Sequence, residues 1–161
     1  MAKRYASPPP LTIDTKKSYT ATIVTNKGTI KLNLLPTVAP NTVNAFVFLA
    51  REGYYNGLMF HRVEDWVVQG GDPTGTGAGG PGYTLKAEFN TTKHVTGTLA
   101  MARTSDPNSA GSQFYIVKQD APWLDRQYTV FGQTIEGMDV VKKLVQGDVM
   151  KSVSIEESAA E

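Results

Sequence analysis

Residues 60–72 read FHRVEDWVVQGGD, an alternating β pattern that is broken once, at Glu64-Asp65. Within it a permanent cation, Arg62, stands beside an apolar run that ends in Gln69 and two glycines. Because arginine is costly to place next to apolar surface, it is seldom found there without a carboxylate, a phosphate or a function. Taken alone, the stretch favours an arginine at a strand edge, paired with Glu64 or Asp65.

The chain on either side of this stretch alternates in the same way. β-Branched and apolar residues recur at every second position, and turn residues separate the runs. This pattern predicts strands at residues 19–25, 29–34, 58–69, 96–102, 113–117, 128–133 and 151–156. A turn at 26–28 joins the first two runs, which predicts a β-hairpin.

Two segments change to helical spacing. Apolar residues recur at intervals of three and four after Pro40, and this pattern stops at Gly53. They spread around the helix, so we expect it to be heavily buried. A second amphipathic pattern begins at Met138 and closes at Gly147. Seven or eight short strands without strict βαβ alternation favour a mostly antiparallel barrel whose ends the two helices cover.

The 161 residues are most economically one domain. We expect an extended N-terminal arm at residues 1–18, because this segment is polar and contains three consecutive prolines. A single barrel domain is expected at 19–157, followed by a frayed tail at 158–161.

The composition excludes several classes of function. The chain has 16 Lys and Arg against 15 Asp and Glu and no dense basic block, so no nucleic-acid partner is expected. It has no cysteine, which rules out disulfides, zinc–thiolate sites and a thiol nucleophile. No signal-peptide core and no window of membrane-spanning length is visible, so we expect a cytoplasmic protein without membrane contact.

Several motifs lack the context that their chemistry needs. Residues 75–80 match G-x-G-x-x-G, but Pro81-Gly82 follows and cannot open the helix of a dinucleotide site, so a flexible surface loop is expected. The two histidines, His61 and His94, have no recognised metal-ligand spacing, so we expect structural roles for both and no metal site. The G-x-S-x-G elbow of a serine hydrolase is missing.

Large apolar and amide side chains accompany the arginine. In residues 113–117, alternation puts Gln113, Tyr115 and Val117 on one face of a strand. If the other face is core, these side chains point outward, and Trp123-Leu124 follows in a loop. Such residues near an arginine suggest a shallow groove for an extended peptide, with a socket for one apolar residue. Half-buried barrel residues would give the same pattern, and the residues alone leave both interpretations open.

Six blocks carry a resemblance to a known family. They are 60–63 (FHRV), 69–72 (QGGD), 101–104 (MART), 111–116 (GSQFYI), 123–125 (WLD) and 130–132 (VFG). In this order and with these gaps they resemble the cyclophilins, which are peptidyl-prolyl cis-trans isomerases, from about Tyr19 to Ile155. Residues 106–109 and the short loop after Gly70 look like the bacterial branch. The resemblance implies a mainly β fold, a closed eight-stranded antiparallel β-barrel capped by two α-helices.

Matched position by position, the resemblance implies Arg62 as the catalytic arginine and Gln69 as its polar neighbour. Trp123 matches the tryptophan associated with cyclosporin binding. The implied substrate-binding residues are a proline socket of Trp66, Val67, Tyr115 and Leu124, main-chain groups of Ala102 and Arg103, and the side chains of Phe60, Gln113, Trp123 and Tyr128.

The chain departs from the family pattern around the socket. Trp66 stands where Phe is common, and the turn before it, Glu64-Asp65, is one residue shorter. Tyr128 stands where many eukaryotic members have His, and Tyr115 where Phe is usual. These departures affect the shape of the socket and the substrate preference, but not the reaction.

The resemblance implies an enzyme that accelerates rotation about X–Pro bonds in unfolded or flexible segments and so assists protein folding. It implies neither cofactor nor metal. Expected partners are proline-containing peptides and unfolded client proteins, with cyclosporin as inhibitor and a monomeric chain. A proline-peptide binding module with little catalysis is the alternative, motivated by the short turn and Trp66. A hydrolase or nucleotide-binding protein is a third interpretation, without supporting geometry.

Overall fold

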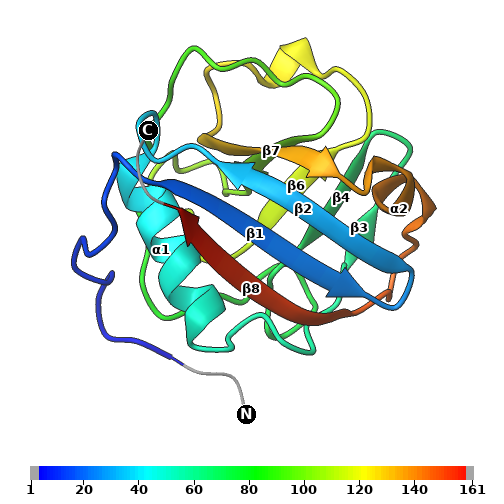
Figure 1. Cartoon of the computed structure of the whole chain (residues 1–161), viewed down its shortest axis with the longest axis horizontal. Coiled ribbons are helices and arrows are strands. Elements are labelled where there is room, and N and C mark those ends of the chain that lie inside the picture. Colours follow the sequence, from blue (N-terminus) through cyan, green and yellow to red (C-terminus); the bar gives the residue numbers. More distant parts are fainter. Residues whose placement is uncertain (1–3, 159–161) are drawn as a thin grey trace.

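Eight antiparallel strands form one sheet in residues 4–158, the part of the chain that the computed structural model describes (Figure 1). The strand order is β3-β4-β6-β5-β7-β2-β1-β8. The strands are β1 (Ser18–Thr25), β2 (Gly28–Leu34), β3 (Arg62–Val63), β4 (Val67–Gly70), β5 (Thr98–Met101), β6 (Phe114–Val117), β7 (Val130–Glu136) and β8 (Met150–Ser158). The prediction of a mainly β fold with eight antiparallel strands and two helices is confirmed.

The sheet curls, and its two end strands, β3 and β8, share no ladder among the described residues. A single bridge joins Met59 to Val149 beside these strands. Backbone hydrogen bonds of 2.7–3.0 Å flank the bridge and connect residues 57–60 with residues 147–150. The eight strands therefore form a curled half-barrel, and the predicted closure is not confirmed, because the two edges meet at this bridge and not along a continuous ladder.

The hairpin of β1 and β2 shows how alternation builds the core. Tyr19, Ala21 and Ile23 are buried in β1, and Ile30 and Leu32 are buried in β2, while the residues between them are partly exposed. Ile23 lies opposite Ile30, and Ala21 lies opposite Leu32. One face of the hairpin is therefore continuous apolar surface, as a half-buried antiparallel pair requires. The predicted hairpin is confirmed.

Helix α1 (Pro40–Arg51) covers one end of the curled sheet, and helix α2 (Met138–Lys143) lies at the opposite end (Figure 1). Pro40 occupies the first turn of α1, where its missing N–H costs nothing. The ring of Phe46 in α1 lies 5.2–5.6 Å from those of Tyr55, Phe114 and Phe131, measured between centroids. The prediction of a heavily buried first helix is confirmed.

Helix α2 is shorter than its sequence pattern predicted. It ends at Lys143, because Leu144 adopts an extended conformation with φ −62° and ψ 140°. Val145, an apolar residue within the predicted helical pattern that closes at Gly147, is 55% exposed. The buried carboxylate of Asp148 accepts a hydrogen bond of 2.8 Å from the Val145 N–H. This bond replaces the helical partner of that N–H and stops the helix.

Buried apolar residues form two clusters, one inside the curled sheet and one on its outer face. The second, which we call the outer cluster, consists of Val67, Ala100, Tyr115, Val117, Ala121 and Val130. It arises because successive strand residues point to opposite faces. The 3₁₀ helix η1 (Pro122–Leu124) follows Ala121 and packs Leu124 against this cluster.

Residues 4–17 contain no helix or strand and run beside α1 (Figure 1). Asn44 in α1, 2% exposed, accepts hydrogen bonds from the N–H groups of Thr12 (3.0 Å) and Ile13 (3.3 Å). At the other end of the chain β8 reaches Ser158, and residues 159–161 of the predicted tail lie outside the described residues. None of the helices described has the length and apolarity needed to span a membrane.

Candidate active site

Side chains from β4 and β6 point away from the main core and onto the outer face of the sheet. In β6, Tyr115 belongs to the outer cluster, whereas its neighbours Phe114 and Ile116 belong to the main core. Gln69 of β4 lies opposite Tyr115 in the ladder, so both project from the same face. The orientation that alternation predicted for residues 113–117 is confirmed.

A pocket of about 130 Å³, which we call the socket, opens over the outer cluster. Typical small-molecule pockets measure about 300–1,000 Å³. The socket therefore fits a single side chain and not an extended ligand. Its apolar lining is Trp66, Val67, Ala102, Tyr115, Leu124 and Tyr128, and its polar rim is Arg62, Gln69 and Arg103. The structure thus brings together the four residues that the sequence assigned to a proline socket and the arginine assigned to catalysis.

Arg62 is held at the rim from two sides. Its Nη1 donates to Gln69 Oε1 at 3.3 Å, which the register of β3 and β4 permits because the two residues face each other. Its Nε donates to Glu64 Oε2 at 2.5 Å. The guanidinium carbon lies 5.7 Å from the centroid of the Trp66 ring. These bonds use two of the five N–H groups of an arginine, so Arg62 keeps donors for a ligand. The ion pair with Glu64 that the stretch alone favoured is present as well.

The short turn between β3 and β4 aims Trp66 at the rim of the socket. Glu64 N–H donates to the carbonyl of Val67 at 2.8 Å, which leaves only Asp65 and Trp66 at the tip. The Trp66 ring packs edge-on against Trp123, with centroids 5.5 Å apart. Lys118 donates from its backbone N–H to the Trp66 carbonyl at 2.7 Å and so ties the tip to the end of β6. The departure from the family pattern therefore builds an aromatic rim and does not fill the socket.

A chain of amide hydrogen bonds leads from Arg62 along the outer face. Gln69 Nε2 donates to Gln113 Oε1 at 3.1 Å. Gln113 Nε2 donates in turn to the carbonyls of Gly77 and Gly79, both at 3.0 Å. The orientation of both glutamines is fixed by these bonds, which leaves Gln69 Oε1 directed at the arginine.

Arg103 holds the far side of the socket. Its Nε donates to the Gln127 carbonyl and its Nη1 to the Thr104 carbonyl, each at 2.8 Å. Its guanidinium carbon lies 4.6 Å from the centroid of the Tyr128 ring, within the range of a cation–π contact. Arg103 therefore joins the loop that carries Leu124 and Tyr128 to the end of β5.

A second pocket, of about 250 Å³, adjoins the socket and shares Gln69, Ala102 and Arg103 with it. We call it the loop pocket, because residues 77–81 form one of its walls. Gln113 lines the loop pocket and, through Gln69, connects it to Arg62. Sequence patterns did not predict this pocket, since its walls are mainly loop segments.

The loop is folded around the carboxylate of Asp72, which is 1% exposed. The carboxylate accepts hydrogen bonds from the N–H groups of Thr74 (2.8 Å), Thr76 (3.1 Å) and Gly77 (2.5 Å). Burial alone would raise the pKa of Asp72, but bonds from Thr74, Gly79 and Gly77 outweigh it and lower the pKa to about 2. The loop expected to be flexible is thus held by its own carboxylate, and its N–H groups are not arranged for a phosphate.

Comparison with known proteins agrees with this groove. The family described as cyclophilin type peptidyl-prolyl cis-trans isomerase/CLD matches residues 20–159, which include every residue of the socket and of the loop pocket. The chain belongs to the cyclophilins. The match leaves out the segment 4–17, which runs beside α1.

Two bacterial cyclophilin relatives are named peptidyl-prolyl cis-trans isomerase. One, from Helicobacter pylori, is 49% identical over 142 residues, which cover 85% of this chain and 86% of that protein. The other, from Synechococcus elongatus, is 48% identical over 143 residues, which cover 87% of this chain and 98% of that protein. A crystal structure of a Cryptosporidium parvum cyclophilin in the presence of the dipeptide Ala-Pro matches with a TM-score of 0.79 at 31% identity, covering 85% of this chain and 98% of that one.

Two of the predicted substrate-binding residues line neither the socket nor the loop pocket. Phe60 is fully buried in the main core, so its side chain cannot touch a bound peptide, and the prediction of a direct contact is corrected. Its backbone instead bonds to Asp148 and Gly147, which fixes the entry to β3 and hence Arg62. Trp123 is 53% exposed and reaches the socket only through its ring contact with Trp66.

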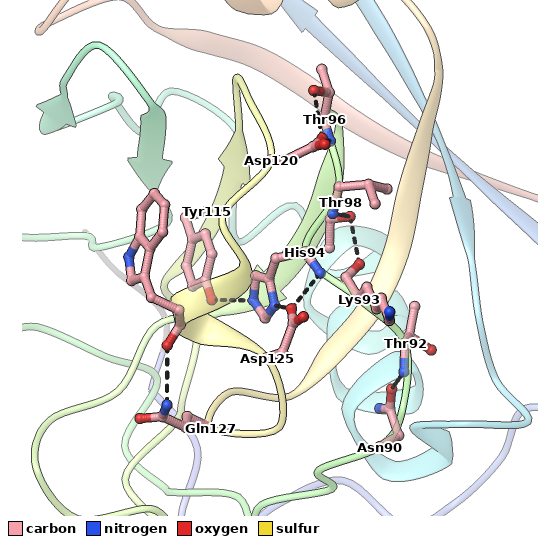
Figure 2. A network of polar contacts seen from close by, with 12 residues as sticks. Asn90, Thr92, Lys93, His94, Thr96, Thr98, Tyr115, Asp120, Asp125 and Gln127 are labelled. Atoms are coloured by element: carbon pink, nitrogen blue, oxygen red, sulfur yellow. Dashed lines mark hydrogen bonds and ion pairs between the residues drawn. The ribbon is translucent and has the colours of Figure 1, made fainter.

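His94 lies directly behind the socket, a position that sequence patterns did not indicate (Figure 2). Its Nε2 is 2.8 Å from the Tyr115 hydroxyl, and its Nδ1 is 3.2 Å from Asp125 Oδ1. Burial lowers the pKa of His94, despite Asp125, so the ring is neutral at pH 7. A neutral imidazole that donates from Nδ1 to Asp125 accepts a hydrogen bond from the Tyr115 hydroxyl at Nε2.

The signal that could have pointed to His94 was the hydroxyl of Tyr115. A tyrosine in place of the usual phenylalanine brings a polar group into an apolar wall, and such a group needs a partner. Burial raises the pKa of Tyr115, so the hydroxyl stays protonated and donates to His94. The residue that fills this need lies 21 positions away in the sequence, which no local pattern reveals.

Proposed function

We propose that this cyclophilin isomerises X–Pro peptide bonds by placing the proline ring in the socket and donating a hydrogen bond from Arg62 to the prolyl nitrogen. The observation that carries the proposal is an arginine with free donors at the rim of an apolar pocket that fits one side chain. The chemistry of the reaction explains why such a site is sufficient.

The X–Pro bond resists rotation because amide resonance must be broken, at a cost of about 18–20 kcal/mol. In the twisted transition state the prolyl nitrogen loses conjugation, and its lone pair becomes a hydrogen-bond acceptor. A guanidinium aimed at that nitrogen stabilises the twisted form more than either planar isomer, which is the differential binding that catalysis requires. No bond is made or cleaved, so the reaction uses neither nucleophile nor cofactor.

Rigid placement of Arg62 adds to this effect. Gln69 and Glu64 hold two edges of the guanidinium, so less motion is lost when the substrate binds. A 10⁵-fold acceleration requires about 7 kcal/mol of barrier reduction. A charged hydrogen bond in a desolvated groove, combined with positioning, has that magnitude.

Groups beside the socket would bind the peptide chain next to proline. We assign this role to the side chains of Gln69 and Gln113 and to the main chain of Ala102 and Arg103, all of which line the loop pocket. An extended peptide that runs from the socket into the loop pocket would meet all four. The solved relative in the presence of Ala-Pro supports a proline-containing ligand for this groove.

The biological substrates that we propose are proline-containing segments of unfolded or flexible proteins, so that the enzyme assists folding as a cytoplasmic monomer. The chain has no cysteine, so its folding needs no oxidising compartment. Cell fractionation tests the cytoplasmic location, and sedimentation of the purified protein tests the monomeric state.

We also propose cyclosporin as an inhibitor, bound through Trp123 and Trp66. Loss of drug binding in Trp123→Ala, with isomerase activity retained, would support this.

A second candidate function is a proline-peptide binding module with little catalysis. The ion pair between Arg62 and Glu64 favours it, because a paired guanidinium is a weaker donor toward a substrate. The pair is half-exposed, however, and exposed pairs contribute only about 0–1 kcal/mol. Peptide binding without acceleration of exchange, measured by NMR, would make this candidate the better one.

We further infer that the barrel is closed in solution at the bridge between Met59 and Val149. The flanking backbone hydrogen bonds support this, and closure would keep β3 and therefore Arg62 from fraying. Amide hydrogen exchange distinguishes a barrel that is closed at this bridge from one that is open there. Protection of the Gly57, Phe60 and Met150 amides comparable to that of β1 supports closure, and rapid exchange of these three contradicts it.

A further inference from the structure

Tyr5, in the arm of residues 4–17, contacts both α1 and the wall of the loop pocket. Its backbone N–H donates to the carbonyl of Pro81 at 2.8 Å. Its ring packs edge-on against Phe48 of α1, with centroids 5.0 Å apart. Because Pro81 lines the loop pocket, one arm residue connects that pocket to the helix that closes the barrel end.

The arm and the loop approach each other too closely for a side chain between them. Gly82 has φ +101°, and a Cβ on it would lie only 2.5 Å from the Tyr5 carbonyl oxygen. On its other side Pro81 packs on Gly111, where an added Cβ would lie 2.8 Å from the proline Cδ. Pro81 is therefore clamped between the arm and the segment that leads to Gln113.

The rest of the arm is anchored and can transmit this constraint. Asn44 bonds to Thr12 and Ile13 with its Oδ1 and to the carbonyl of Pro10 with its Nδ2, at 3.0 Å. Ile13 packs against the main core. The arm is thus fixed at its middle by a buried amide and at its beginning by Tyr5.

The two halves of the loop have different supports. Asp72 holds the first half with its carboxylate, through the N–H groups of Thr74, Thr76 and Gly77, and also bonds to Gly79. Tyr5 holds the second half at Pro81. Between these supports the carbonyls of Gly77 and Gly79 accept the two hydrogen bonds that orient Gln113.

We propose that the N-terminal arm is a positioning element of the substrate groove. Tyr5 fixes residues 77–81, and so sets the shape of the loop pocket and the affinity for peptide residues beyond the X–Pro pair. The inference rests on the proposed isomerase function, and it assigns a role to a segment that the family match, residues 20–159, leaves out. Because the socket and Arg62 do not touch the arm, the rate of rotation of a bound X–Pro pair is independent of it.

The test compares Tyr5→Ala with Leu11→Ala, an arm variant whose side chain is 55% exposed in the wild type. Isomerisation is measured by NMR exchange on two peptides, a capped Ala-Pro dipeptide and a hexapeptide with the same pair at its centre. Tyr5→Ala should raise KM for the hexapeptide about fivefold, the size of a typical long-range coupling. Its kcat on both peptides and its KM for the dipeptide should stay at the Leu11→Ala values.

A second measurement separates positioning from general loss of stability. Hydrogen exchange at the amides of Gly79 and Gly80 should speed up in Tyr5→Ala, while exchange at Gly77, whose N–H bonds to Asp72, and in β4 and β6 stays unchanged. Tyr5→Ala removes the ring that packs on Phe48 but keeps the backbone N–H that bonds to Pro81. A variant that lacks residues 1–6 removes both contacts, so its changes should be at least as large. Equal changes in KM for both peptides, or unchanged KM and loop exchange in the variant that lacks residues 1–6, overturn the proposal. If the wild type accelerates neither peptide, the isomerase function fails, and the exchange experiment still decides whether the arm holds the loop.

Discussion

The socket and the loop pocket lie side by side and share three residues, but they are held by different forces. Four of the nine side chains of the socket stand on strands β3, β4 and β6, and its apolar lining packs on the buried outer cluster. The wall of the loop pocket consists of backbone that is held by one carboxylate, one glutamine and one arm residue. Packing should therefore determine the stability of the socket, and individual hydrogen bonds that of the loop pocket. This difference suits a site in which the socket with Arg62 is rigid and the loop pocket beside it can adapt to the peptide.

The largest effect should come from removing the socket wall. Tyr115→Ala deletes a buried aromatic ring from the outer cluster, and such truncations cost about 3–5 kcal/mol of unfolding free energy. Chemical denaturation should show this loss, and NMR should show the loop amides of residues 77–80 nearly unchanged. Trp123→Ala, at the exposed rim, is the control and should change stability by about 0.5 kcal/mol or less. A similar cost for both variants would contradict the role of packing.

Asp72→Asn should have the next largest effect and should act on the other pocket. The depressed pKa of Asp72, about 2 against 3.8 in the unfolded chain, corresponds to about 2 kcal/mol of stability at pH 7. Denaturation should show a loss of this size, and exchange should accelerate at the amides of Thr74, Thr76 and Gly77. Turnover of a capped Ala-Pro dipeptide, which needs only the socket, should be retained.

The same carboxylate makes a prediction about pH. The folded pKa lies below the unfolded one, so the contribution of Asp72 is present above about pH 4 and is lost as pH falls toward 2. The acid limb of the stability curve should be shallower in Asp72→Asn than in the wild type. Asp65→Asn, at the exposed tip of the turn, is the matched control. If stability falls equally steeply in acid in Asp72→Asn and Asp65→Asn, the carboxylate does not hold the loop.

A smaller effect is expected for Tyr115→Phe, which restores the residue usual in the family. The ring that lines the socket remains, so turnover of X–Pro peptides should be preserved. His94 Nε2 loses its donor in the buried wall, and an unsatisfied group of this kind costs about 1–3 kcal/mol. Thermal denaturation should place the loss near the low end of this range. Unchanged stability would show that the histidine bond contributes nothing net.

The smallest effect is a pH slope at His94. Burial lowers the pKa of His94 below 6.5, so the unfolded chain binds a proton that the folded protein does not. Stability should therefore fall as pH drops below about 6.5, and His94→Gln should remove part of this slope. Burial also lowers the pKa of His61, so His61→Gln must be measured as well to separate the contributions of the two histidines. A slope that neither variant reduces would contradict a neutral His94.

Much of the fold followed from local patterns in the sequence, whereas the socket residues were assigned from the family resemblance. Alternation in residues 113–117 oriented Tyr115 correctly, and the blocks around Arg62, Gln113 and Trp123 indicated the family. The end of α2 did not follow, because the Asp148 carboxylate captures the Val145 N–H and no spacing rule reports such a bond. Phe60 was misplaced since membership of a motif does not reveal which side of the sheet a side chain occupies.

The loop pocket and the support behind Tyr115 required three-dimensional contacts. Asp72 bonds to residues two to five positions ahead, but in a glycine-rich run the same letters are compatible with a mobile loop. Tyr5 meets Pro81, and His94 meets Tyr115, across long separations in sequence. Such pairs are fixed by how the sheet curls and not by any local preference.

The most direct test of the account is an NMR exchange measurement on an X–Pro peptide with Arg62→Ala, Arg62→Lys and Glu64→Gln beside the wild type. Removing the donor should lower kcat/KM by about 10²–10³-fold, as for other donors that act on developing charge or lone pairs. Arg62→Lys should restore only part of this activity, because lysine lacks the planar set of donors of a guanidinium. Glu64→Gln should stay close to the wild-type activity. Unchanged exchange in a folded Arg62→Ala protein would contradict the central role of this arginine.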